Sequence, residues 1–218
     1  MTQKRKSARR SYHHGNLREA LIDVARRLIV DRGPHGFSLV EAATLAGVSP
    51  AAPYRHFANR EALLAQVALT GYERFASELE QAWADGQPDA VTAFMRMGEV
   101  YLTFARYERA SYIAMFEADL AGDEVSGLNE AGNRAFATLT RAAVAMGGQL
   151  PDGSPIQPEM MGAHIWALSH GMATLFATPK TAPVGSDNKQ VTSDIKTLFE
   201  SGMKIYLTGL GIEFPSAD

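Results

Sequence analysis

Apolar residues along this chain recur mainly at helical spacing, three or four positions apart. From Leu17 to Ile29 they fall at i, i+4, i+7, i+8, i+11 and i+12, which is the pattern of a helix with one buried face. The Asp-Arg-Gly-Pro sequence at 31–34 predicts the end of that helix. Because no stretch alternates convincingly as a β-strand does, the pattern predicts an all-α protein.

A second, short helix is predicted from a capping box. Ser38 and Glu41 are spaced so that the serine hydroxyl accepts from the Glu41 amide while the carboxylate reaches back to the start of the helix. This helix is expected to end near Ala46. With its neighbours on both sides it makes the pattern of a helix-turn-helix unit.

The third helix of this unit is predicted from the residues after Gly47, which can adopt the left-handed conformation of a tight turn. Ser49 is a suitable N-cap, and Pro50 a suitable first helical residue. Pro53 and Phe57 lie four apart and are assigned to the packed face. Since Pro53 has no amide, we expect a loose or 3₁₀-like first turn.

The rest of the pattern predicts a long helix and a helical body. Asn59 caps a helix that begins at Arg60 and carries apolar positions to about Trp83. At about 1.5 Å per residue it would be roughly 35–40 Å long. Further helices are predicted over residues 89–106 and 108–119, from the stretch after 127 up to 146, and over 159–178 and 193–210.

The charge of the chain divides at about residue 60. Residues 1–60 hold 11 of the 21 Lys and Arg but 4 of the 24 acids, a charge of +7, whereas residues 61–218 carry −10. This asymmetry favours nucleic acid as a partner of the N-terminal quarter, the alternative being a solvated basic tail. The predicted organisation is a basic flexible arm (1–14), a helix-turn-helix domain (15–60) and a C-terminal domain (61–218).

Several classes of function lack their sequence signals. The chain has no cysteine, no phosphate-binding Gly loop, no H-E-x-x-H and no G-x-S-x-G, so we expect no catalytic residue, no cofactor and no enzyme. His164 and His170 are six apart and do not form a metal pair, so no metal site is expected. No run reaches the roughly 18 apolar residues of a membrane span, and the basic N-terminus is not a secretory signal, which agrees with a cytoplasmic protein.

Residues 12–66 resemble the DNA-binding domain of TetR-type regulators. The shared features are a Phe-Ser helix start at 37–38, Gly-Val-Ser at 47–49, Tyr-x-His-Phe at 54–57 and a basic residue that begins a long helix. The Trp-Ala-Leu-Ser-His-Gly sequence at 166–171, with Tyr-x-x-Met-Phe at 112–116, is similar to the C-terminal domain of a subgroup with a Trp…His-Gly signature.

The resemblance implies a homodimer in which each helix-turn-helix reads half of a palindromic operator in double-stranded DNA. The residues at the matching positions would contact phosphates or the major groove. They are Ser38, Ser49, Pro50, Ala51, Ala52, Tyr54, Arg55, His56 and Arg60. Ala51 stands where the family often has Gly, Pro53 where Leu is frequent, and Arg60 where Lys is usual.

A cavity for a small-molecule effector inside the body is also implied by the resemblance. Apolar and Met-rich walls suit varied apolar ligands, although each such side chain can equally be plain core. The residues assigned to this cavity are Phe94, Met97, Tyr101, Phe104, Tyr112, Met115, Phe116, Trp166 and His170. The function expected is a ligand-responsive transcriptional regulator, most simply a repressor released from its operator by a small apolar molecule. The alternatives are a nonspecific architectural DNA binder and an unusual helical enzyme.

Overall fold

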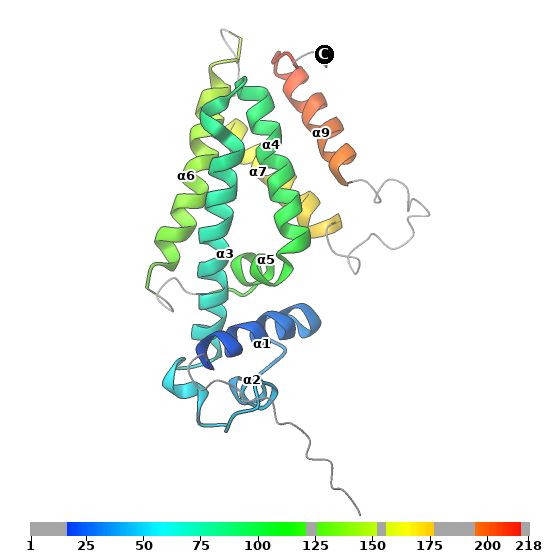
Figure 1. Ribbon diagram of the computed structural model, residues 1–218. Coiled ribbons are helices and arrows are strands. Elements are labelled where there is room, and N and C mark those ends of the chain that lie inside the picture. The colour runs from blue at the N-terminus through cyan, green and yellow to red at the C-terminus, as the bar shows by residue number, and fades with distance from the viewer. Residues whose placement is uncertain (1–16, 121–125, 152–155, 177–194, 215–218) are drawn as a thin grey trace, which may run out of the picture.

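The computed structural model describes residues 17–120, 126–151, 156–176 and 195–214. Within these ranges every regular element is a helix, as predicted, and a small head is joined to a larger body by one long helix (Figure 1). The head contains α1 (Leu17–Arg32), α2 (Leu39–Leu45) and the 3₁₀ turn η1 (Pro53–Arg55). The long helix and the body contain α3 (Arg60–Trp83), η2 (Ala84–Gly86), α4 (Ala90–Tyr107), α5 (Arg109–Phe116), α6 (Leu128–Gly147), α7 (Pro158–Phe176) and α9 (Ile195–Gly209).

The first two helices form as the sequence predicts. The apolar stripe of α1 faces the core, with Leu21 and Ile29 completely buried, and the helix stops at Gly33, whose φ of 81° is left-handed. At the start of α2 the Ser38 hydroxyl accepts from the Glu41 amide at 3.2 Å. The Glu41 carboxylate accepts from the Ser38 amide at 2.8 Å, which completes the capping box.

The third predicted helix differs in the structure. Gly47 has a φ of 73°, as expected, but the chain after Ser49 forms turns and then η1. The prediction of an α-helix from Pro50 to Phe57 is therefore wrong. The helical element in this segment is the 3₁₀ turn η1, and 3₁₀ geometry had been expected only for the first turn. The reason is that Pro53, at the fourth position of the predicted helix, has no amide hydrogen to donate to the Ser49 carbonyl, whereas a proline at the first position removes no helical hydrogen bond.

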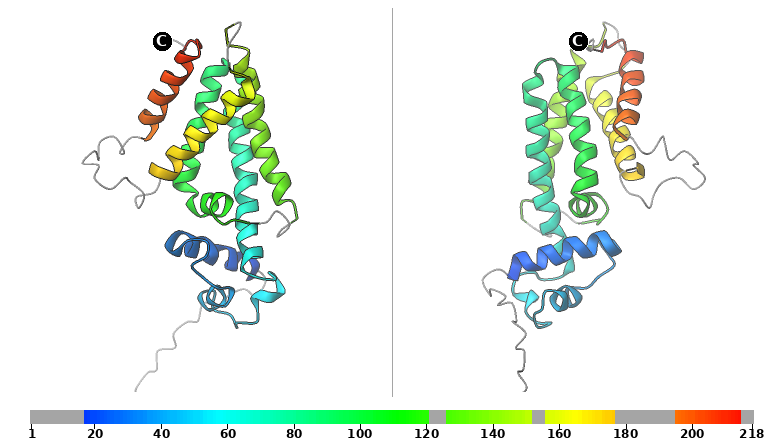
Figure 2. Two further views of the ribbon diagram at one scale, coloured as in Figure 1. Left: turned by 180° about the vertical axis from the view of Figure 1, so that it is seen from behind. Right: turned by 45° about the vertical axis from the view of Figure 1, so that its right-hand side comes forward.

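The apolar core of the head continues into the body. α1, α2 and Phe57 pack against Leu63 and Leu64 at the start of α3, and the same cluster includes Ile113 and Ala114 of α5. α5 lies between α1 and the rest of the body (Figures 1 and 2). A unit of this size buries only a marginal core alone, so the shared core lets the body stabilise the head. The predicted domain boundary stays a prediction.

Two glycines let helices of the body approach one another closely. Gly71 of α3 faces α5, where a Cβ would lie 2.7 Å from the Met115 Sδ and 2.9 Å from the Ser111 Cβ. Gly98 of α4 faces α9, where a Cβ would overlap the ring of Phe199, a side chain with no exposed surface. α7 and α9 lie together on the side of the body away from α3 (Figure 2).

The remaining predicted helices correspond to described elements. The stretches 89–106 and 108–119 correspond to α4 and α5, and the stretch after 127 corresponds to α6. The stretches 159–178 and 193–210 correspond to α7, which begins one residue earlier at Pro158, and to α9. Asn59 caps α3 as predicted, because its side chain accepts from the Ala62 amide at 2.7 Å. The basic arm over 1–14 and the loop predicted over 179–192 lie outside the described residues.

Candidate functional site

The turn η1 belongs to the head and lies just before α3 in the chain, and it presents a short polar surface to solvent. The Tyr54 side chain is 56% exposed, and Arg55 and His56 are also exposed. Within the described part of the chain, no hydrogen bond or ion pair holds these three side chains. Pro53 and Phe57 are buried beneath them, so the predicted division into a packed face and an outward face is confirmed even though the segment is not an α-helix.

The residues before η1 add an apolar part to this surface. Ser49, Pro50 and Ala51 are exposed and Ala52 is half-buried. The Ala52 amide donates to the Ser49 carbonyl at 3.0 Å, which closes the turn. These four residues carry one hydroxyl between them, so Tyr54 and the two residues after it must supply most of the polar contacts from this surface.

Two predicted phosphate ligands already have partners in the structure. The Ser38 hydroxyl donates to the Glu41 carboxylate at 3.0 Å, and the hydrogen bond from the Ser38 amide lowers the pKa of Glu41, which keeps a negative charge there. Arg60 donates to the His35 carbonyl at 3.2 Å and pairs with the Glu61 carboxylate. A phosphate at either position would therefore share or replace an existing bond.

Arg18 was not among the predicted residues, yet it supports η1. Its guanidinium lies over the Phe57 ring, 5.5 Å from the centroid. It also donates to the Gln66 side chain of α3 at 2.6 Å. Arg18 thus links α1, the end of the exposed turn and α3. The available sequence signal was its position off the apolar stripe of the first helix, which says only that it is not core.

Inside the body, a hydrogen-bonded group of polar side chains joins α4, α5 and α7. The Nδ1 atom of His170 is 2.9 Å from the Tyr101 hydroxyl and 3.0 Å from the Tyr112 hydroxyl. The Tyr112 hydroxyl is also 3.1 Å from the Thr174 Oγ1. Burial lowers the pKa of His170 and raises the pKa of both tyrosines. All of these groups are therefore uncharged near neutral pH.

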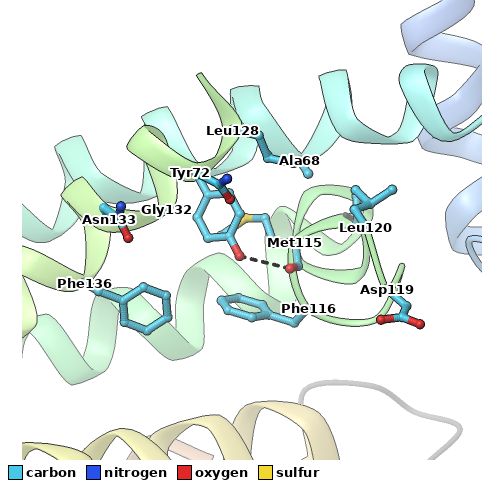
Figure 3. Close-up of a pocket in the computed structure, with 12 residues that line it drawn as sticks. Ala68, Tyr72, Met115, Phe116, Asp119, Leu120, Leu128, Gly132, Asn133 and Phe136 are labelled. Carbon is cyan, nitrogen blue, oxygen red and sulfur yellow. Dashed lines mark hydrogen bonds between the residues drawn. The ribbon is translucent and has the colours of Figure 1, made fainter. Parts of the chain in front are cut away.

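A cavity of about 300 Å³ lies between α3, α5 and α6 (Figure 3). Three aromatic rings contribute to its wall: Tyr72, Phe116 and Phe136. The Tyr72 hydroxyl donates to the Met115 carbonyl at 3.0 Å, and burial raises the pKa of Tyr72, so it remains a neutral phenol. The size is at the lower end of the range of small-molecule pockets.

Polar side chains also line this cavity. They are Asp119, Asn129 and Asn133. Asn129 and Asn133 are exposed on α6 and Asp119 is exposed after α5, whereas Ala68 and Ala114 on the same wall are buried. The cavity therefore has an apolar interior and a polar edge.

The nine residues predicted to line one cavity lie in several different environments. Met115 and Phe116 line the 300 Å³ cavity. A second space of about 20 Å³, roughly enough for one water molecule, is lined by Phe94, Met97, Tyr101 and Trp166. Tyr112 and His170 belong to the hydrogen-bonded group. Phe104 packs against the Phe75 ring with 4.9 Å between centroids. Ligand binding by these nine residues stays a prediction.

Sequence reasoning missed several residues that line the larger cavity, notably Tyr72, Asp119, Gly132 and Phe136. Gly132 and Phe136 are four apart and therefore share a helix face, which was the available signal. Tyr72 was assigned to the apolar positions of the long helix. No pattern indicates Asp119, which follows α5 with a positive φ of 47°.

In the described ranges, no three His, Cys, Asp or Glu side chains gather as metal ligands would. The helices of the same ranges include none long and apolar enough to cross a membrane.

Comparison with known proteins decides the family. Residues 21–67 match the family described as "Bacterial regulatory proteins, tetR family", and residues 94–200 match "Tetracyclin repressor-like, C-terminal domain". The chain belongs to the TetR family. TetR proteins are transcriptional regulators that bind DNA and act as dimers, not enzymes, and α2, η1 and the start of α3 lie within the first match.

Individual TetR relatives agree with this assignment. The HTH-type transcriptional regulator BetI of Rhizobium meliloti (strain 1021) is 31% identical over 113 residues, and the match covers 51% of this chain and 56% of BetI, so the match spans little more than half of that relative. A solved protein of unknown function from Rhodococcus sp. RHA1 is 30% identical, with a TM-score of 0.64 over 88% of this chain and 98% of its own. A tetR-family regulatory protein from Rhodococcus RHA1 is 18% identical and shares the fold, with a TM-score of 0.69 over 91% of this chain and 99% of its own.

Proposed function

We propose that this TetR-family protein is a homodimeric, cytoplasmic repressor that binds a palindromic operator and leaves it when a small molecule enters the body. One observation supports the coupling above all others. Ala68, Ala114 and Leu128 line the 300 Å³ cavity and also belong to the apolar core of the head. A ligand in the cavity would therefore press on side chains that fix the position of the head.

The exposed residues of η1 would read the DNA. Arg55 is unpaired in the described part of the chain and can donate two parallel hydrogen bonds to the O6 and N7 atoms of a guanine. Tyr54 and His56 flank it on the same exposed turn. Ser49 would bind a phosphate of the DNA backbone, and Ala51 and Ala52 would contact thymine methyl groups.

The second copy of the chain would pack on α7 and α9. Large apolar side chains are exposed on these helices: Met160 is 54% exposed, Leu175 48% and Ile205 76%. Ala163 and Ala167 of α7 are exposed as well and leave room for a close helix approach. By contrast, Gly162 faces Ala143 within the subunit, so this small residue of α7 is not available to a dimer.

Operator release would follow from geometry. Two heads on adjacent major grooves need recognition segments about 34 Å apart, so a displacement of a few ångströms prevents simultaneous contact. Coupling of about 1–3 kcal/mol between the two sites would change operator affinity roughly 5–150-fold.

The experiment is a selection of bound DNA from a random pool with the full chain. We expect a palindromic consensus, protection of that palindrome in a footprint, and release by at least one compound from a small-molecule library. Sequences without a consensus would support the architectural alternative instead. Arg55→Ala is the informative control, because a protein that reads bases through this residue should select a weaker consensus at the corresponding positions.

A further inference from the structure

The charge of the cavity wall is one-sided. Asp119 is the charged residue among those that line the 300 Å³ cavity, and none of the described lining residues is Lys, Arg or His. A buried anion without a positive partner would lose its hydration uncompensated, so this wall disfavours carboxylates and phosphates.

The aromatic part of the wall favours the opposite charge. Tyr72, Phe116 and Phe136 turn their rings toward the same space (Figure 3). Faces of aromatic rings attract cations, and most strongly where water is excluded. The hydroxyl hydrogen of Tyr72 is already donated to the Met115 carbonyl, so toward a ligand this phenol oxygen can only accept. Both features select a ligand that brings positive charge and donors.

We propose that this cavity binds a small organic cation, an ammonium group on a short apolar body, in preference to a neutral or anionic molecule of the same shape. The inference rests on the proposed function, which makes this cavity the effector site, and replaces its unspecified apolar ligand by a chemical class. The ammonium group lies against the Phe116 ring, on the side of Asp119, and the apolar body extends toward Phe136 at the other end of the cavity (Figure 3).

The first test uses three probes that share one skeleton: 2-phenylethylammonium, 2-phenylethanol and phenylacetate. Each is titrated calorimetrically into the full-length protein at pH 7 without DNA. We expect the ammonium to bind at least about tenfold more tightly than the alcohol, and phenylacetate to bind most weakly. Phenylacetate binding as tightly as the ammonium, or no binding of the ammonium, would overturn the proposal.

Asp119→Asn tests the charge. Asp119 has a φ of 47°, and Asn tolerates the left-handed region as well as Asp does, so the backbone is preserved. The affinity for 2-phenylethylammonium should fall about fivefold to tenfold, while that for 2-phenylethanol should change less than twofold. Asp85→Asn is the matched control, since Asp85 also has a positive φ (52°) but lies in η2 at the far end of α3. An Asp119→Asn variant with unchanged ammonium affinity contradicts the proposed charge selection.

Gly132→Leu tests the location. A Cβ at Gly132 would lie 3.8 Å from the Tyr72 Cζ, which is an ordinary contact, and the rest of the leucine would occupy cavity space. Binding of the ammonium should be lost, whereas Ala137→Leu on the exposed face of α6 should leave it unchanged. Thermal melts show whether both variants are folded. As a second readout, the labelled Met115 methyl resonance should shift when the ammonium is added to wild type; an unmoved signal, or full binding by folded Gly132→Leu, places the probe elsewhere.

Operator release separates this proposal from the one it rests on. Because the titrations contain no DNA, they do not depend on the operator being found. If an anionic compound releases the operator and 2-phenylethylammonium does not, regulation by ligand stands and the cation preference is wrong. If the ammonium binds the cavity but operator affinity never changes, the cation site stands and the regulatory coupling is wrong.

Discussion

The head and the body of this protein differ in how completely their interiors are filled. The head closes its core around Phe57 and leaves polar side chains outside, where η1 is held by two prolines and by Arg18. The body leaves about 300 Å³ open between α3, α5 and α6. A surface that reads DNA gains from a fixed shape, because ordering it on binding costs free energy. A sensor needs space and a wall that can move.

The head and the body also differ in charge. The N-terminal quarter carries +7 and the remainder −10. A polyanion should therefore engage the head and avoid the body, whereas a small cation would find its site in the body.

The largest difference should appear in the salt dependence. If the dimer neutralises about six phosphates, log K for operator binding should fall against log salt with a slope near −5, a loss of about a thousandfold between 50 and 200 mM. Binding of 2-phenylethylammonium in the body should change by less than about threefold, because partly buried charges are weakly screened. Fluorescence anisotropy and calorimetry measure the two. A slope of log K against log salt near zero would contradict DNA binding by the head.

The next largest difference should appear in the stability lost when a large aromatic side chain is truncated in each region. Phe57→Ala should lower the free energy of unfolding by about 3–5 kcal/mol, because Phe57 is buried in a filled core. Phe136→Ala should cost less than half as much, since its half-buried ring already borders open space and lacks partner atoms on one side. Urea unfolding provides both values. Equal losses would show that the cavity wall is packed as tightly as the head.

Replacing a single arginine of the head should then weaken DNA recognition without changing the stability of the fold. Arg55→Ala should weaken binding to the selected operator by about 1–3 kcal/mol and relax one base position, with little change in unfolding free energy. Arg106→Ala, at an exposed position of α4 in the body, serves as the control and should leave DNA affinity unchanged. If Arg55→Ala instead weakens binding to every DNA sequence by the same factor, Arg55 is a phosphate ligand.

The smallest effect concerns pH and belongs to the body. Burial lowers the pKa of His170 in the folded state, so below the ordinary histidine pKa of about 6.5 the unfolded chain binds the proton first. Stability contributed by neutral His170 should therefore be present at pH 7 and decline as pH falls through that range to the lowered folded value. His170→Asn keeps an acceptor near the tyrosines and should lose less stability between pH 7 and pH 5 in thermal melts. A larger loss in the variant contradicts this assignment.

The head was predictable because its signals are local. The capping box of Ser38 and Glu41, the turn at Gly47 and the cap at Asn59 depend on residues within a few positions of each other. The error at Pro50 to Phe57 was also local: the pattern of faces was right, but the missing amide of Pro53 removed a hydrogen bond that an α-helix needs. In the body, helix spans were predicted and most cavity residues were not.

By itself the sequence determined every helix except the one predicted from Pro50 to Phe57, together with the charge asymmetry and the resemblance that identifies the family, since each depends on neighbouring residues or on counts. Only the tertiary structure decided that Tyr101, Tyr112 and His170 share hydrogen bonds, and that Tyr72 and Phe136 enclose a cavity beside the head. The physical reason is that a cavity is space left between helices. Its walls depend on how side chains from distant segments fill or fail to fill that space, which no periodicity within one helix records.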